Sequence, residues 1–138
     1  MREILFRGKT FITKKMVTGT GILYDGTNTW IVNNEPPKAL AFGMERYTVI
    51  PETIGQYTGL TNKNGTKIFE GDICQIKGIS YIDETPFVVE WNEEYSGWFW
   101  RNLDFSSATD TITPEIAKTS RIIGNIHDNP ELLKEREG

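Results

Sequence analysis

Apolar residues occur in short runs along the whole chain, and glycine, proline, asparagine and aspartate separate the runs. Several runs alternate apolar with polar positions or consist of β-branched and aromatic residues, which is typical of strands. Pairs of runs on either side of a short turn predict antiparallel hairpins. The predicted strands are 4–7, 11–17, 22–24, 30–32, 46–50, 54–61, 67–69, 73–76, 79–82, 87–91, 98–101 and 121–126.

Helix signals occur at two places in the last third of the chain. Pro114–Lys118 predicts one helical turn within segment 104–120, whose Ser, Thr and Asp content otherwise predicts irregular structure. Asn129 stands where a helix N-cap would, and Pro130 follows at the first helical position. The fold class expected from these patterns is mostly β, with short-stranded antiparallel sheets and a short C-terminal helix.

The length of 138 residues is enough to bury a core without disulfides or metals. We expect a single domain over residues 1–138, with two candidate subdomains: an N-terminal β region, 1–67, and a second β region, 68–127. The strand order in the second region is similar to that of small SH3-like barrels. That analogy rests on strand order alone.

The densest turn chemistry lies in the stretch Val49–Ile76. Asn64 and Gly65 tolerate the positive φ angles that tight hairpin turns need. The pattern therefore predicts a strand, a turn at Asn62–Thr66, and a second strand. Glu70–Asp72 is a further turn signal, which leads into the strand 73–76.

Three blocks of sequence follow one another in a fixed order. The first is R-E-I-L-F-R at 2–7. The second is P-E-T-I-G-Q-Y-T-G-L at 51–60, which leads through K-N-G at 63–65 into F-E-G-D-I at 69–73. The third is I-I-G-N-I-H-D-N-P-E-L-L at 122–133. In this order the blocks resemble the YopX family of phage and prophage proteins.

The rest of the chain follows the family pattern only loosely, at residues 8–48 and 77–120. Asn62 stands where an aspartate is usual, and Gly8 and Lys9 replace the usual Ala-Trp. The resemblance implies a largely β fold encoded by a phage-derived gene. It implies no established activity and no catalytic residues.

Net charge is −4, which disfavours broad electrostatic attraction to nucleic acid or to anionic lipid. The first twenty residues are the exception, because they carry five cations and one acid. Lysines on a solvated strand edge, where they discourage edge-to-edge pairing, are one interpretation of this basic start. The alternative is a phosphate-contacting arm, with Lys9, Lys14 and Lys15 as its candidate contacts.

Residues with reactive side chains do not assemble into a recognisable catalytic set. His127, the only histidine, suits either a strand-to-helix turn or a metal site, and nothing else supplies matching ligands. Cys74 lies in an apolar strand, where a free thiol behaves as a small hydrophobe. Glu70 and Asp72 flank a glycine, a position typical of turn caps, although paired carboxylates also do acid–base work. We assign no catalytic residue, no metal ligand, no cofactor and no small-molecule ligand.

The aromatic hairpin at 87–101 is the best candidate interaction surface. Alternation places Trp98 and Trp100 on one face of their strand and Phe99 on the other. A one-residue change of register exchanges these faces, so the tryptophans belong either to the core or to an interface. Burial of both tryptophans is favoured, because they carry more apolar area, with Tyr95 the more exposed aromatic. The candidate interaction residues are Tyr95, Trp98 and Trp100.

The charge of this hairpin selects between classes of partner. Residues 86–110 carry five acids and one cation, so a protein surface or a second copy of the chain fits better than a phosphate backbone. The single Cys74 is compatible with a reducing compartment, and the sequence offers neither a signal peptide nor a membrane span. We therefore expect a non-enzymatic phage or prophage protein in the cytoplasm of the bacterial host, which binds a protein partner or itself. The alternative is a nucleic-acid-binding accessory protein that uses the basic start and the aromatic hairpin.

Overall fold

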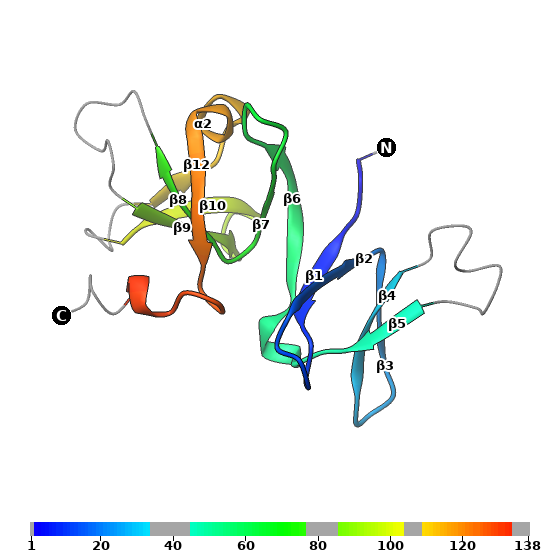
Figure 1. Ribbon diagram of the computed structural model, residues 1–138. Helices are drawn as coiled ribbons and strands as arrows, with labels where there is room; N and C mark the ends of the chain where they lie inside the picture. Colours follow the sequence, from blue (N-terminus) through cyan, green and yellow to red (C-terminus); the bar gives the residue numbers. More distant parts are fainter. Residues whose placement is uncertain (1, 34–44, 77–85, 104–108, 134–138) are drawn as a thin grey trace. The chain divides into compact units, whose positions relative to one another are not determined.

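The computed structural model describes residues 2–33, 45–76, 86–103 and 109–133 (Figure 1). Short antiparallel strands dominate the described chain, which confirms the expected mostly β fold class. The chain forms two compact units, Met1–Tyr57 and Thr58–Gly138. They divide within one strand, β6 (Gly55–Thr61), and the subdomain boundary suggested at residue 67 stays a prediction.

The first unit is built on a three-stranded antiparallel sheet with β4 at its centre, between β3 and β5. The strand β4 buries Ile31 and Val32, which form part of the core of this unit. The strand β1 pairs with β2 on one side and with the beginning of β6 on the other. The bounds are β1 Phe6–Lys9, β2 Met16–Gly19, β3 Gly21–Tyr24, β4 Thr29–Asn33, β5 Glu45–Thr48 and the 3-10 helix η1 Pro51–Thr53.

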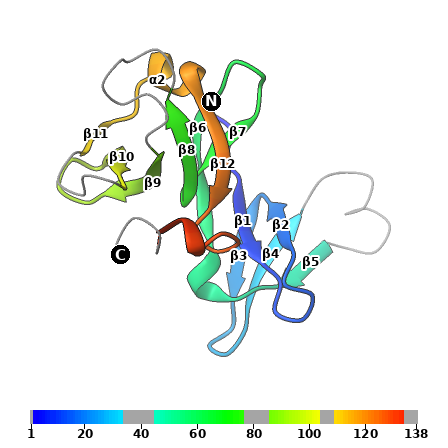
Figure 2. The same ribbon diagram turned by 60° about the vertical axis from the view of Figure 1, so that its left-hand side comes forward.

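The second unit contains a five-stranded antiparallel sheet in the order β11-β10-β9-β8-β12, so the last strand of the chain lies beside β8 (Figure 2). These strands form a half-barrel, and its closer likeness to an SH3-like barrel stays a prediction. The bounds are β7 Lys67–Phe69, β8 Asp72–Ile76, β9 Pro86–Asn92, β10 Gly97–Asn102, β11 Thr109–Thr111, α2 Pro114–Thr119 and β12 Ser120–Asn125.

Both faces of this five-stranded sheet are covered by apolar side chains. One group, which we call the α2 cluster, consists of the buried residues Ile68, Cys74, Ile76, Phe87, Val89, Ile112 and Ala117. The other, which we call the C-terminal cluster, consists of Ile73, Val88 and Leu103, with Ile123, Ile126, Leu132 and Leu133 packed against them. Because β8 and β9 contribute to both clusters, their sequences are nearly continuous apolar runs.

The two turns expected in the central stretch are present. The N–H of Gly65 donates to the carbonyl of Asn62, and the N–H of Asn62 donates to the carbonyl of Thr66, both at 3.0 Å. Gly65 has a φ of 81°, whereas Asn64 is not among the residues with positive φ. In the second turn Asp72 is buried, and its carboxylate accepts the N–H of Phe69 at 2.7 Å.

The helices lie where their sequence signals predict them. The side chain of Thr113 caps α2 by accepting the N–H of Ile116, and Pro114 occupies the first turn. Residues 131–133 are helical after Pro130, so the expected C-terminal helix begins as predicted.

Two predictions about strands need correction. The predicted strand 11–17 is wrong in its first half, because Phe11–Thr13 form a turn and the strand begins only at Met16. Segment 104–120 was expected to be irregular apart from one helical turn, yet its residues Thr109–Thr111 pair with β10 as β11. The predicted strand 79–82 lies outside the described residues.

Candidate functional site

The aromatic hairpin consists of β9 and β10, and its register settles which residues share a face. Trp98 lies opposite Trp91, Trp100 opposite Val89, and Phe99 opposite Glu90. The two tryptophans of β10 therefore lie on the same face as Phe87, Val89 and Trp91, and Phe99 lies on the other face with Glu90.

The tryptophans differ in their surroundings. Trp100 packs against the α2 cluster and makes an edge-to-face contact with Phe87, with ring centroids 6.1 Å apart. Its indole Nε1 is buried and has no hydrogen-bond partner among the residues that the structure describes. Trp98 is half-buried and makes an edge-to-face contact at 5.1 Å with Trp91, whose side chain is 42% exposed. Both tryptophans are therefore partly buried, but Trp100 packs on the α2 cluster whereas Trp98 packs on the exposed Trp91.

Tyr95, in the loop between the two strands, is 68% exposed. Its ring stacks on Phe99, with centroids 5.6 Å apart and planes inclined by 13°. The loop is held in place by the Asn92 side chain, which accepts the N–H of Tyr95 at 2.9 Å, and Ser96 adopts a φ of 51°. Phe99 itself is 9% exposed, so β10 buries side chains on both of its faces. Among the described aromatic residues of the hairpin, Tyr95 is the most exposed.

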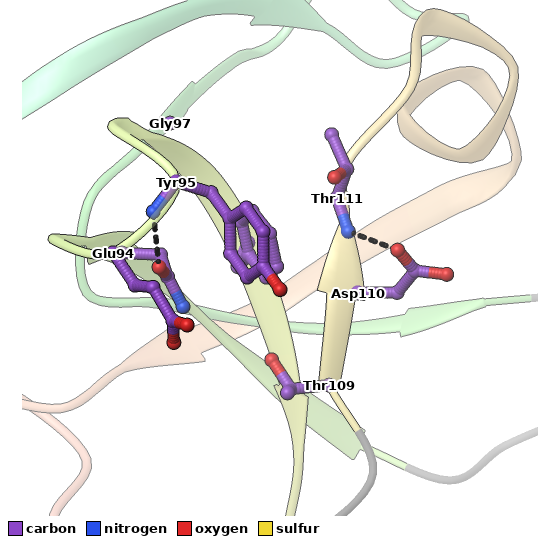
Figure 3. A pocket seen from close by; sticks show the side chains of 8 residues that line it. Glu94, Tyr95, Gly97, Thr109, Asp110 and Thr111 are labelled. Atoms are coloured by element: carbon purple, nitrogen blue, oxygen red, sulfur yellow. Dashed lines mark hydrogen bonds between the residues drawn. The ribbon is translucent and has the colours of Figure 1, made fainter.

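A pocket of about 500 Å³ opens beside this stacked pair (Figure 3). The loop side of the pocket is formed by Tyr95 and Glu94, and the side of β11 lies across from them. The charged residues in its lining are two carboxylates, Glu94 and Asp110. The full lining is Asn92, Glu94, Tyr95, Gly97, Phe99, Thr109, Asp110 and Thr111.

The pocket lies at the edge of the sheet, because β11 is the outermost strand. The N–H of Thr111 donates to the Asp110 carboxylate at 2.7 Å, whereas the next N–H, that of Ile112, donates to the carbonyl of Trp98. Successive N–H groups of a strand point to opposite sides, so the outward donor of Thr111 is already occupied. This disfavours addition of a further strand at that point and favours recognition by side chains.

The chemistry of the pocket is that of a site for a cation. Carboxylates attract lysine, arginine and other ammonium groups, and an exposed aromatic face adds a cation–π contribution. The nearest basic side chain of the hairpin, Arg101, is paired with Glu90 at 3.2 Å. The pocket lining contains no histidine, cysteine or lysine; its reactive groups are the carboxylates of Glu94 and Asp110 and the hydroxyls of Tyr95, Thr109 and Thr111.

The candidate phosphate contacts lie in the first unit. Lys9 ends β1, is half-buried and interacts with other residues, whereas Lys14 and Lys15 are exposed after the Phe11–Thr13 turn. The Nζ of Lys14 lies 5.1 Å from the ring centroid of Phe11, and Lys14 adopts a φ of 58°. The three lysines are thus near one end of the β1–β2 hairpin, and one of them is engaged by an aromatic ring.

The remaining reactive residues have structural surroundings. Cys74 is fully buried in the α2 cluster. The N–H of His127 donates to the Asn125 side chain in the turn after β12. Within the ranges that the structure describes, no group of three or more His, Cys, Asp or Glu residues could hold a metal ion. None of the helices described here is long and apolar enough to cross a membrane.

Sequence reasoning identified Tyr95 but missed the other walls of its pocket. Phe99 was expected on the less buried face, and its burial depends on the stacked Tyr95 ring as well as on the sheet. Asp110 was counted only as a local charge, because the pattern around it did not predict a strand. Its place in the pocket lining follows from the pairing of β11 with β10, which short-range patterns do not encode; Asp110 pairs with Trp100, so its side chain lies on the Trp100 face, whereas Thr111 lies on the face of Phe99 and Tyr95.

Comparisons with known proteins bear on the family and the fold. The family model described as YopX protein matches residues 5–134. A crystal structure of protein EF1440 from Enterococcus faecalis is similar, with a TM-score of 0.58 and 24% sequence identity. The match covers 96% of this chain and 99% of that one, and at this identity it supports the fold alone. No curated protein matches the sequence.

Proposed function

We propose that this chain, which belongs to the YopX family, is a non-enzymatic protein that binds a partner protein through the Tyr95 pocket. The observation that carries the proposal is an exposed tyrosine, stacked on Phe99, above a lining whose charged members are Glu94 and Asp110. Exposed aromatic residues that are held rigidly are typical anchors of protein interfaces. The partner group that suits this pocket is a lysine or arginine side chain on a folded protein or a peptide.

The charge of the surrounding hairpin supports a protein partner over a nucleic acid. Glu93 and Glu94 lie in the loop next to Tyr95, and Asp110 belongs to the pocket lining, although its side chain points away from the Tyr95 ring (Figure 3). A phosphate backbone would be repelled by these carboxylates, whereas a basic protein surface would be attracted and oriented by them. A second copy of the chain is the other candidate, since its first twenty residues are basic.

The setting we propose is the cytoplasm of a bacterium that carries the gene on a phage or prophage. The resemblance of the three sequence blocks to phage and prophage proteins supports the origin. The buried single cysteine is compatible with a reducing compartment.

The test begins with affinity purification of the full chain from such a bacterium and identification of co-purifying proteins by mass spectrometry. Binding of the purified partner is then measured by calorimetry for the wild-type chain, Tyr95→Ala and Glu94→Gln. We expect each change to weaken binding about tenfold or more, and we expect raised salt to weaken the wild-type complex. Sedimentation analysis of the chain alone measures self-association in parallel.

Tyr24→Ala is the matched control, because Tyr24 is an equally exposed tyrosine at 70% but lies on β3 in the first unit. The control variant should bind as the wild type does. The proposal would be contradicted if Tyr24→Ala weakened partner binding as much as the pocket variants do. It would also be contradicted if both pocket variants bound the partner with wild-type affinity, because the interface would then lie elsewhere.

A further inference from the structure

A second pocket in the Thr58–Gly138 unit has the opposite charge. It encloses about 330 Å³ between the turn that joins β6 to β7 and the junction of α2 with β12. Three cationic side chains line it, Lys63 from the turn, Lys118 from the end of α2 and Arg121 from β12. Its lining contains no carboxylate, although the chain as a whole has a net charge of −4.

The positive charge of this pocket is not neutralised by the described residues. Lys63 and Lys118 make neither an ion pair nor a hydrogen bond through their ammonium groups in the part of the chain that the structure covers. The guanidinium of Arg121 donates from Nη2 to the side-chain oxygen of Gln75 at 2.6 Å, and that partner is uncharged. This contact also fixes the direction of the arginine side chain along the sheet.

Asn62 adds a neutral donor that has no partner. The side chain lines the pocket and is 9% exposed, and its Oδ1 accepts the N–H groups of Asn64 and Thr66, both at 3.0 Å. These two bonds fix the orientation of the amide. Its Nδ2 has no hydrogen-bond partner among the described residues and is left to donate to a ligand or to water.

The end of α2 does not oppose an anion as strongly as a bare helix C-terminus would. Unpaired carbonyls at that end carry partial negative charge. Here the carbonyl of Ile116 accepts from the hydroxyl of Thr119 at 3.0 Å, and that of Ala117 accepts from Ser120 at 2.8 Å. A lysine is common at the C-terminal end of a helix, which by itself would explain the position of Lys118. That explanation does not apply to Lys63 or Arg121, because they belong to other elements.

We propose that this pocket binds the phosphate group of a small phosphorylated molecule. Three cations and a fixed amide donor match the three oxygens of a phosphate ester, and an arginine fork beside lysines is a common arrangement for that group. The volume lies at the lower end of the range for small-molecule sites, which suits a ligand about the size of a mononucleotide. The proposal is independent of the partner binding assigned to the Tyr95 pocket.

The test uses adenosine monophosphate, adenosine and inorganic pyrophosphate as probes of the full chain in calorimetry. Adenosine monophosphate and pyrophosphate should bind, and adenosine, which has no phosphate, should not. Lys63→Gln and Arg121→Gln should each weaken binding about tenfold. Asn62→Asp keeps the acceptor for the N–H groups of Asn64 and Thr66 but places a carboxylate in the pocket, so it should abolish binding while the chain stays folded by circular dichroism.

Lys67→Gln is the matched control, because it removes the same charge from an exposed lysine of the same unit that is not part of the pocket lining. It should leave the affinity within twofold of the wild type. The proposal is overturned by a wild-type chain that binds neither phosphate probe at millimolar concentration, or by pocket variants that bind as the wild type does. Equal weakening by Lys67→Gln would show a general charge effect and contradict the proposal. Tighter binding of a ten-nucleotide single strand than of the mononucleotide would also contradict it, because it would identify nucleic acid as the ligand.

Discussion

Gly65 adopts the backbone conformation on which the turn between β6 and β7 depends. Its φ of 81° is strained for any residue with a β-branched side chain, although a Cβ there would meet no neighbouring atom. Gly65→Val should therefore lower the free energy of unfolding by about 1–3 kcal/mol, from backbone strain alone. Chemical denaturation of both proteins measures the difference.

Gly65→Asn is the control for this prediction, since asparagine tolerates the left-handed region better than other non-glycine residues. It should cost less than the valine variant. Equal midpoints for the wild type and the valine variant would mean that position 65 has ordinary backbone geometry in solution.

Asp25 is a residue whose titration reports on the loop between β3 and β4. The backbone N–H groups of Asn28 and Thr27, which donate to its Oδ1 at 2.7 and 2.9 Å, lower the pKa of this carboxyl. Because the pKa is lower in the folded chain, the stabilisation is present above the unfolded-state pKa and is lost as the pH falls through the folded value. A titration followed by NMR should show Asp25 protonating at lower pH than aspartate in an unfolded peptide.

The matching variant is Asp25→Asn, which keeps a side-chain oxygen but removes the titration. Its stability should lack the acid dependence that the loop gives the wild type. A midpoint for Asp25 at or above the unfolded-state value would contradict the geometry of the loop.

Single residues were well predicted where a local rule governs them. The turn at Asn62–Thr66 and the capping role of Asp72 follow from the conformational preferences of Gly, Asn and Asp, and the structure has both. The assignment of positive φ to Asn64 as well as Gly65 was too broad. In the observed turn, only Gly65 adopts a positive φ. Hairpin loops that end in a single glycine have the same arrangement.

At the scale of elements, β10 carries two partly buried tryptophans that pack on different neighbours. Trp100→Ala should cost about 3–5 kcal/mol of stability, because the ring fills space in the α2 cluster. Trp98→Ala should cost clearly less, because Trp98 packs on the exposed Trp91. Denaturation of the two variants side by side gives both values.

Trp100→Phe separates packing from hydrogen bonding at the core position. The indole Nε1 of Trp100 is buried without a partner, so the phenylalanine variant removes a desolvated donor as well as some volume. It should cost less than the alanine variant. A larger loss for Trp98→Ala than for Trp100→Ala would show that Trp98, and not Trp100, makes the greater packing contribution.

The alternation of apolar and polar positions predicted the strands of this hairpin correctly but not the burial of both of their faces. It assumes one wet face and one dry face, whereas β8 and β9 are covered on both faces by the α2 and C-terminal clusters. Glu90 lies on the face opposite the tryptophans, and that face also buries Val88. The second cover comes from Ile126, Leu132 and Leu133, far along the chain, so no pattern within the hairpin could indicate it.

At the scale of the whole molecule, net charge decides the response to long nucleic acids. The chain should bind duplex DNA only weakly at physiological salt, because its net charge of −4 opposes the phosphate backbone. A fluorescence titration with labelled duplex at several salt concentrations measures this. The triple variant Lys9→Ala, Lys14→Ala, Lys15→Ala should behave as the wild type does.

A different result would favour the alternative function. Submicromolar, salt-sensitive binding that disappears in the triple lysine variant would assign nucleic-acid binding to the first unit. Membership of the YopX family does not decide between these outcomes. The similarity to EF1440 does not decide either, because it supports the fold alone.

The pairing of strands also sets the order in which a growing chain can fold on the ribosome. The hairpin of β9 and β10 closes within a few residues of its own synthesis, but β1 must wait for β6, since Arg7 pairs with Gly55. The strand β8 must wait longer, because Asn125 of β12 pairs with Asp72. At about 5–20 residues per second, β8 therefore spends several seconds with one unpaired edge, during which Ile73 and Ile76 are open to chaperones and to other nascent chains.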